Sequence, residues 1–161
     1  MKTRTWTPAL AIAFAAAALL AAPAPAAVAA TQDDGTTLTL YTGRVGTRAV
    51  TMYLQDEPAP CGGILRTISA VYRYDGVSKW LALDANSDRK GHLALVESSL
   101  GSGISGALML VRDGAGLKGK WISPDGERVL PVRFDPAPAL ARKRKEMAET
   151  LEKVHYENDD C

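Results

Sequence analysis

The chain has little of the chemistry on which hydrolytic enzymes depend. It contains two histidines and two cysteines in 161 residues, and neither His92 nor His155 is spaced to activate a serine or cysteine nucleophile. A Gly-x-Ser-x-Gly nucleophile elbow that starts at Gly103 would need a glycine in place of Ala107. We therefore predict a non-enzymatic protein with no catalytic residues and no cofactor.

An excess of charge of either sign is also absent. Lys and Arg number 19 against 18 Asp and Glu, a net charge of +1. Lys2 and Arg4 are the only charged residues before Thr31, so without them the chain carries 17 basic against 18 acidic side chains. A balanced chain lacks the field that attracts nucleic acids. The basic run Arg142–Lys145 is followed by acids and indicates a solvated helix face, so we expect no nucleic-acid partner.

The first 30 residues contain 14 alanines but no acid and no glycine. Lys2 and Arg4 precede an apolar run from Ala9 to Ala22, and small residues follow at Ala27–Ala30. This is the layout of a signal peptide, and the run is shorter than the about 20 residues that cross a bilayer. We predict a signal peptide at residues 1–30, with an uncleaved anchor as the alternative. The mature chain would have no membrane span and would be periplasmic or secreted.

Export changes the interpretation of Cys61 and Cys161, because thiol pairs in oxidising compartments usually form disulfides. Cys61 lies in a loop rich in proline and glycine, and Cys161 is the last residue of the sequence. A bond between them would close a loop of roughly 100 residues and contribute about 4 to 5 kcal/mol through loop-closure entropy. We predict this disulfide. Two free thiols, or a bond between two molecules, are the alternatives.

The central segment holds all the glycines, from Gly35 to Gly126, and its apolar residues alternate with polar ones between recurring turn signals. Val45-Gly46-Thr47 and Asp75-Gly76 are typical of hairpin turns. The pattern predicts a mainly β domain over residues 31–135, an eight-stranded antiparallel meander folded as a small barrel or a sandwich. The predicted strands are Thr37–Arg44, Arg48–Gln55, Ile64–Tyr74, Ser78–Asp84, His92–Ser98, Ser105–Arg112, Leu117–Ile122 and Arg128–Phe134.

Residues 136–161 contain no glycine and predict a C-terminal α-helix and tail. Asp135 can cap a helix that begins with Pro136. We expect one apolar stripe of this helix to pack on the β domain. The residues of that stripe are Leu140, Met147, Leu151 and Val154.

Two polar features have alternative interpretations. The segment Asp84–Asp88 has the one-three-five oxygen spacing of a calcium loop, but Arg89 stands where that loop needs glycine. We therefore interpret it as an ordinary turn and predict no metal site. Glu97 lies near a strand end among apolar residues and is interpreted as a paired or sheet-edge glutamate, with a catalytic acid as the alternative. Other acids, including Asp56, are expected at turns.

The segment Ser98–Ser105 is long for a hairpin loop, and it carries two apolar residues between small polar ones. A loop of this kind can enter the cleft of another protein. We predict that a protein partner contacts Leu100, Ser102 and Ile104. A turn without a binding role is the alternative.

Four segments carry the turn and packing residues of the central region: Tyr41–Gly46, Val71–Gly76, Leu95–Glu97 and Leu117–Gly126. They resemble a β-rich module of exported bacterial proteins, similar to domains that accompany periplasmic lysozyme-inhibitor-like proteins. The resemblance extends over most of residues 36–134. Because its residues serve turns and packing, it implies a fold and no activity.

Export, a β-rich body with a predicted disulfide, and the missing catalytic set together favour a binding protein. We predict an inhibitor or immunity protein whose partner is a cell-wall hydrolase or a toxin. The alternative is an envelope structural protein, or one that binds a small apolar ligand within its sheet.

Overall fold

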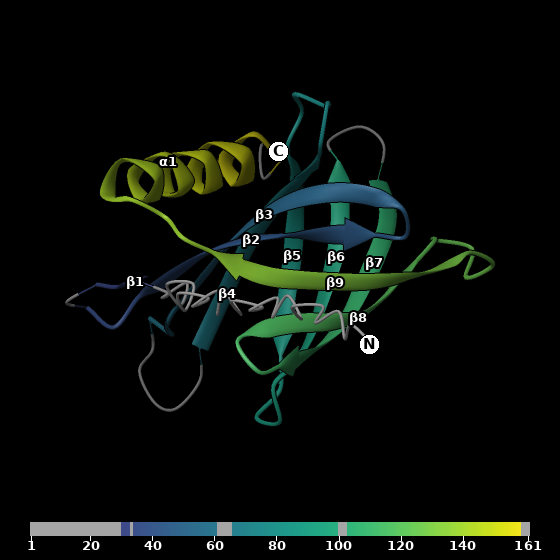
Figure 1. Cartoon of the computed structure of the whole chain (residues 1–161), viewed down its shortest axis with the longest axis horizontal. Coiled ribbons are helices and arrows are strands. Elements are labelled where there is room, and N and C mark those ends of the chain that lie inside the picture. Colours follow the sequence, from purple (N-terminus) through teal and green to yellow (C-terminus); the bar gives the residue numbers. More distant parts are fainter. Residues whose placement is uncertain (1–29, 33, 61–65, 100–102, 159–161) are drawn as a thin grey trace, which may run out of the picture.

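Antiparallel strands follow one another around a closed barrel, and one helix crosses its outside (Figure 1). The computed structural model describes residues 30–32, 34–60, 66–99 and 103–158. A short strand, β1 (Ala30–Thr31), pairs with the start of β2. The remaining elements are β2 (Thr37–Val45), β3 (Arg48–Pro58), β4 (Arg66–Tyr74), β5 (Leu81–Ser87), β6 (His92–Ser99), β7 (Gly103–Asp113), β8 (Gly116–Ile122), β9 (Val129–Ala137) and α1 (Ala141–Asn158).

Pairing of the last strand with β2 closes the barrel. Each strand from β2 to β9 pairs with the next in sequence, and β9 also pairs with β2 from Leu40↔Ala137 to Val45↔Val132. The predicted eight-stranded antiparallel meander with a C-terminal helix is confirmed, and its form is a barrel and not a sandwich. Both edges of the meander are thereby hydrogen-bonded.

Alternation along the strands sends every second side chain into the barrel. An eight-stranded barrel is just wide enough for such side chains to fill it. The buried side chains of this interior cluster are Tyr41, Val45, Val50, Met52, Leu54, Ile68, Ala70, Tyr72, Leu83, Leu93, Leu95, Leu108, Leu110, Leu117, Trp121, Val132 and Phe134. The interior is therefore a packed core.

One predicted strand is displaced. Residues 78–80, expected to begin a strand, instead follow a turn in which the Val77 amide donates to the Tyr74 carbonyl. Residues 85–87, expected to be a turn, continue β5 because they pair with Leu93–Leu95 of β6. The prediction for Ser78–Asp84 was therefore too early by three residues at each end.

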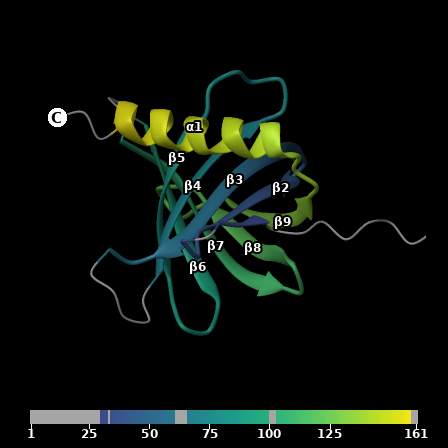
Figure 2. The ribbon, with the colours of Figure 1, turned by 90° about the vertical axis from the view of Figure 1, so that its left-hand side faces the viewer.

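The helix α1 packs on the outer face of β2–β5, as Figure 2 shows. Its buried residues Met147, Leu151 and Val154 confirm most of the predicted stripe. Leu140 does not belong to it, since its side chain lies before α1 and is 82% exposed. The barrel residues of this second cluster are Leu38, Leu40, Tyr53, Val71 and Ala82.

The predicted start of the helix is also wrong. Asp135 and Pro136 belong to β9, where they pair with Thr42 and Tyr41. This pairing closes the barrel, so the strand continues to Ala137 and the helix begins only at Ala141. Pro136 lacks a backbone N–H, which confines proline to positions where the ladder needs no donor.

Several predictions fall outside the described residues: most of the signal peptide, Cys61 with Cys161, and both Leu100 and Ser102. The signal peptide and the disulfide therefore stay predictions. In the part of the chain that the structure describes, no helix combines the length and the apolar character needed to cross a membrane.

Candidate functional site

The helix α1 covers one half of the outer surface of the barrel and leaves the other half uncovered. The helix α1 lies on β2–β5, whereas β6–β9 turn their outer face away from it (Figure 2). On that outer face, side chains of paired residues form two adjacent rows across the four strands. The first row is Val96, Ala107, Ile122 and Val129, and the second is Ala94, Met109, Lys120 and Pro131. We call these eight residues the β6–β9 face.

All members of the β6–β9 face except Lys120 are apolar, although the face lies on the outside of the barrel. Met109 is 51% exposed and Val129 is 49% exposed, and Pro131 is exposed as well. Contiguous apolar groups on the outside of a protein often mark a site of contact with another molecule. The β6–β9 face is therefore the candidate protein-binding surface.

Basic side chains accompany this apolar face. Lys120 stands between Met109 and Pro131 in the second row and has no ion-pair partner among the described residues. The next row toward the other barrel end contains Lys118 and Arg133. Both contact Asp113, at 3.0 and 3.1 Å respectively. The cation of Lys120 thus remains available to an acidic group of a partner.

Ile104 is the only one of the three predicted partner-binding residues that the structure describes. Its side chain is 60% exposed, and it pairs with Ser98 across a bulge in the β6–β7 ladder. Ile104 thus belongs to β7 and not to a loop as predicted, because pairing continues to Ser99↔Gly103. The same strand supplies Ala107 and Met109, so Ile104 extends the β6–β9 face toward one barrel end.

The barrel end near Ile104 contains the buried carboxylate of Glu97. Glu97 is 3% exposed and lies in the interior, where the hydroxyl of Tyr72 and the indole N–H of Trp121 both donate to Oε1. The Ser105 hydroxyl donates to Oε2 at 3.0 Å. Burial, together with the Glu97 carboxylate, raises the pKa of Tyr72 well above its usual range, so its hydroxyl remains a donor. Three donors therefore hold Glu97, which lies inside the barrel and not at a sheet edge.

No family assignment comes from known proteins. Comparisons of the chain with protein-family models, with curated proteins and with solved structures gave no match. The resemblance to lysozyme-inhibitor-like domains therefore stays a prediction.

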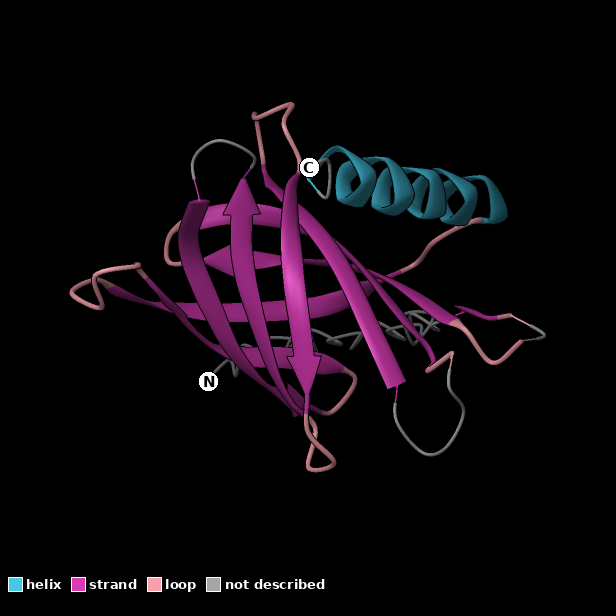
Figure 3. Cartoon of the chain, turned by 180° about the vertical axis from the view of Figure 1, so that it is seen from behind, coloured by secondary structure: helices cyan, strands magenta, loops and turns pink. Residues whose placement is uncertain are grey.

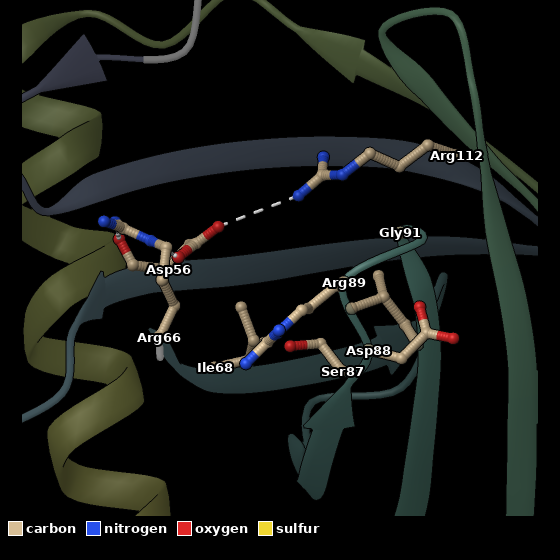
Figure 4. Close-up of a pocket in the computed structure, with 9 residues that line it drawn as sticks. Asp56, Arg66, Ile68, Ser87, Asp88, Arg89, Gly91 and Arg112 are labelled. Atoms are coloured by element: carbon tan, nitrogen blue, oxygen red, sulfur yellow. Dashed lines mark hydrogen bonds and ion pairs between the residues drawn. The ribbon is translucent and has the colours of Figure 1, made fainter. Parts of the chain in front are cut away.

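The opposite barrel end opens into a polar pocket of about 300 Å³ (Figure 4). Asp56, predicted to lie at a turn, instead lies in β3 paired with Ile68, two residues beyond the inward-facing Leu54. Arg66 forms an ion pair with its carboxylate, and Arg112 Nη2 lies 3.7 Å from Oδ2. We call the pocket formed around Asp56, Arg66, Arg89 and Arg112 the arginine pocket.

A second pocket, of about 350 Å³, adjoins the arginine pocket and shares Asp56 and Arg112 with it. Tyr41 lines this second pocket. Burial raises the pKa of Tyr41, and the nearby Arg112 opposes that effect. Asp56 and Arg112 thus form part of the wall of both pockets.

The Asp84–Asp88 segment does not form a calcium-type loop among the described residues, because Asp84 and Asn86 are strand residues of β5. Asp88 caps the turn that follows: its Oδ1 accepts from the amides of Lys90 and His92, at 2.8 and 2.9 Å. Its Oδ2 lies 2.6 Å from His92 Nδ1. This arrangement matches an Asx-type turn.

The Asp88 turn predicts a specific acid sensitivity. Hydrogen bonding to His92 lowers the pKa of Asp88 from 3.8 to about 2. A lowered folded-state pKa stabilises the fold at pH values above 3.8, and that contribution is lost as the pH falls toward 2. In Asp88→Asn the urea midpoint should fall at neutral pH and change less with pH across this window than in the wild type. Parallel midpoint profiles for the two proteins would contradict the assignment.

Proposed function

We propose that this chain is a non-enzymatic binding protein of the periplasm or the medium, and that the β6–β9 face holds its protein partner. The observation that carries the proposal is the apolar row of Val96, Ala107, Ile122 and Val129, which α1 does not cover and in which Val129 is exposed and the other three are half-buried. A closed barrel lacks the free edge needed to bind a partner by strand addition. A partner would therefore contact the side chains on the outer surface of the barrel.

The charges of the face indicate what kind of partner it fits. An apolar centre around Met109, with a Lys120 cation that has no ion-pair partner in the described part of the chain, suits an apolar surface that contains an acidic group. Enzymes that cleave glycosidic bonds present two carboxylates in their clefts. The predicted signal peptide would bring the chain to the compartment in which cell-wall hydrolases act. We therefore infer an inhibitor or immunity protein whose partner is a cell-wall hydrolase or a toxin.

The alternative of an apolar ligand inside the sheet receives less support from the packing. Met52, Tyr72 and Phe134 are among the large side chains that are fully buried in the interior. A ligand in that space would have to displace them, at a cost typical of core disruption. The outer face requires no such rearrangement.

The test compares Met109→Glu with Leu140→Glu in the mature chain. Both residues are exposed and apolar, but only Met109 belongs to the β6–β9 face. A charge at the centre of an apolar interface should weaken partner binding at least about tenfold. Immobilised wild-type chain would first retain hydrolases from an envelope extract, and the purified hydrolase would then be titrated with each variant while its muramidase or amidase activity is followed.

We expect Leu140→Glu to bind and inhibit as the wild type does, because its side chain lies outside the face. Circular dichroism would verify that both variants remain folded. If the extract contains no hydrolase or toxin that the wild type retains or inhibits, the proposal is wrong. Equal binding by Met109→Glu and Leu140→Glu would exclude the β6–β9 face as the binding surface.

A further inference from the structure

The arginine pocket lies at the far end of the barrel from Ile104, since β7 begins near Ile104 and ends near Arg112. Three guanidinium groups from different elements line it. Arg66 comes from the start of β4, Arg89 from the turn between β5 and β6, and Arg112 from the end of β7. Figure 4 shows the side chain of Arg112 reaching toward Asp56 and, in this view, the Arg89 guanidinium drawn beside Ser87 and Ile68.

The positive charge of this pocket is only partly neutralised. Asp56 is shared by Arg66 and Arg112, so one carboxylate faces two guanidinium groups. Arg89 has no ion-pair partner among the described residues. The pocket also contains Asp88, but that carboxylate is engaged by two backbone amides and by His92. Figure 4 shows it pointing away from the Arg89 guanidinium.

The remaining lining is apolar or carries a small hydroxyl. Ile68 is 8% exposed and Leu93 is 2% exposed, and both line the pocket together with Ser87. A volume of about 300 Å³ is at the small end of the range for sites that hold organic ligands. The pocket thus combines guanidinium donors at its opening with apolar side chains on its wall.

We propose that the arginine pocket binds a small organic oxyanion, a carboxylate or a phosphate ester with a short apolar stem. The planar fork of a guanidinium matches both oxyanions, because two N–H groups can donate in parallel to two oxygens. Arg89 and Arg112 donate to the oxyanion, and the stem contacts Ile68 and Leu93. Asp56 acts as a positioning residue: it holds Arg66 directly and keeps Arg112 at the opening.

Calorimetric titration of the mature chain with hexanoate and with hexyl phosphate tests this proposal, and hexanol serves as the uncharged probe. We expect saturable binding of at least one of the two oxyanions, weaker binding at higher ionic strength, and no detectable binding of hexanol. The stronger of the two oxyanion probes identifies whether carboxylate or phosphate is preferred. None of these titrations requires the protein partner. Their outcome is therefore independent of whether the β6–β9 face binds one.

Arg89→Gln is the decisive variant, because Arg89 forms no ion pair within the described residues and its loss should leave the fold intact. Loss of a charged hydrogen bond should lower oxyanion affinity by about tenfold or more, and Arg112→Gln should act in the same direction. Arg142→Gln, an exposed arginine of α1, is the matched control and should bind as the wild type does. Wild-type protein that binds neither probe, or Arg89→Gln that binds both unchanged, would overturn the proposal.

Discussion

Replacement of Glu97 by leucine should lower the free energy of unfolding by about 2 to 4 kcal/mol, because it leaves the buried indole N–H of Trp121 without an acceptor and leaves the buried hydroxyl of Tyr72 only its 3.3 Å contact with the Tyr74 hydroxyl. Each buried donor without a partner costs about 1 to 3 kcal/mol. Ser105 is exposed and can turn to water, so it adds little. Urea unfolding followed by circular dichroism measures the effect.

Two companion variants separate the hydrogen bonds from the change in size. Glu97→Gln keeps one side-chain oxygen as an acceptor and should lose only about 1 to 2 kcal/mol. Glu127→Leu changes an exposed glutamate in a turn and should stay within about 0.5 kcal/mol of the wild type. If Glu97→Leu were as stable as Glu127→Leu, the two buried donors, the Tyr72 hydroxyl and the Trp121 indole N–H, would not depend on this carboxylate.

Gly119→Ala should lower the free energy of unfolding by about 3 kcal/mol, because its new methyl group would collide with backbone atoms that cannot move independently. A Cβ at Gly119 would meet the carbonyl oxygen of Met109 and lie 2.9 Å from the Cα of Leu110. Both atoms belong to β7, whose ladder with β8 pairs Leu110 with Gly119. Relief of the collision therefore requires two strands of the barrel to separate.

Gly114→Ala is the control for Gly119→Ala. Gly114 has a φ of +60°, and a Cβ added there would have no neighbouring atom within 4 Å. Alanine at this position therefore costs only the left-handed backbone conformation, about 1 to 2 kcal/mol. Thermal and urea unfolding of both variants give the comparison. An equal loss at the two sites would mean that the β7–β8 approach does not restrict residue 119.

Most of the strands can be predicted from sequence because the turn residues are local signals. Gly46 and Gly76 adopt positive φ at the two turns that Val45-Gly46-Thr47 and Asp75-Gly76 predicted. Closure of the barrel could not be predicted, because the pairing of β2 with β9 joins segments from opposite ends of the domain. The same pairing explains why Pro136 is a strand residue and not the first residue of a helix.

Two residues of the arginine pocket could have been predicted from the sequence by extending the alternation of inward and outward side chains beyond the apolar part of each strand. Asp56 lies two residues after Leu54, and Arg112 lies two residues after Leu110, so both occupy inward positions. Arg89 lies in a turn, where no alternation applies. The residues of the β6–β9 face alternate with the buried residues of the same strands, as Ala107 and Met109 do within the apolar run Ala107–Val111. Only the structure, however, shows which half of the barrel α1 covers.

In the closed barrel, each strand from β2 to β9 has a hydrogen-bonded neighbour on both sides, so no strand is an edge. Because β9 pairs with β2 just as every other strand pairs with its neighbour in sequence (Figure 3), the two ends of the meander lie side by side at Leu40 and Ala137. A linker that leads from the end of α1 back to the start of β2, combined with new termini at an exposed turn such as that of Gly126, would preserve every strand pair from β2 to β9. The barrel is therefore a natural candidate for circular permutation.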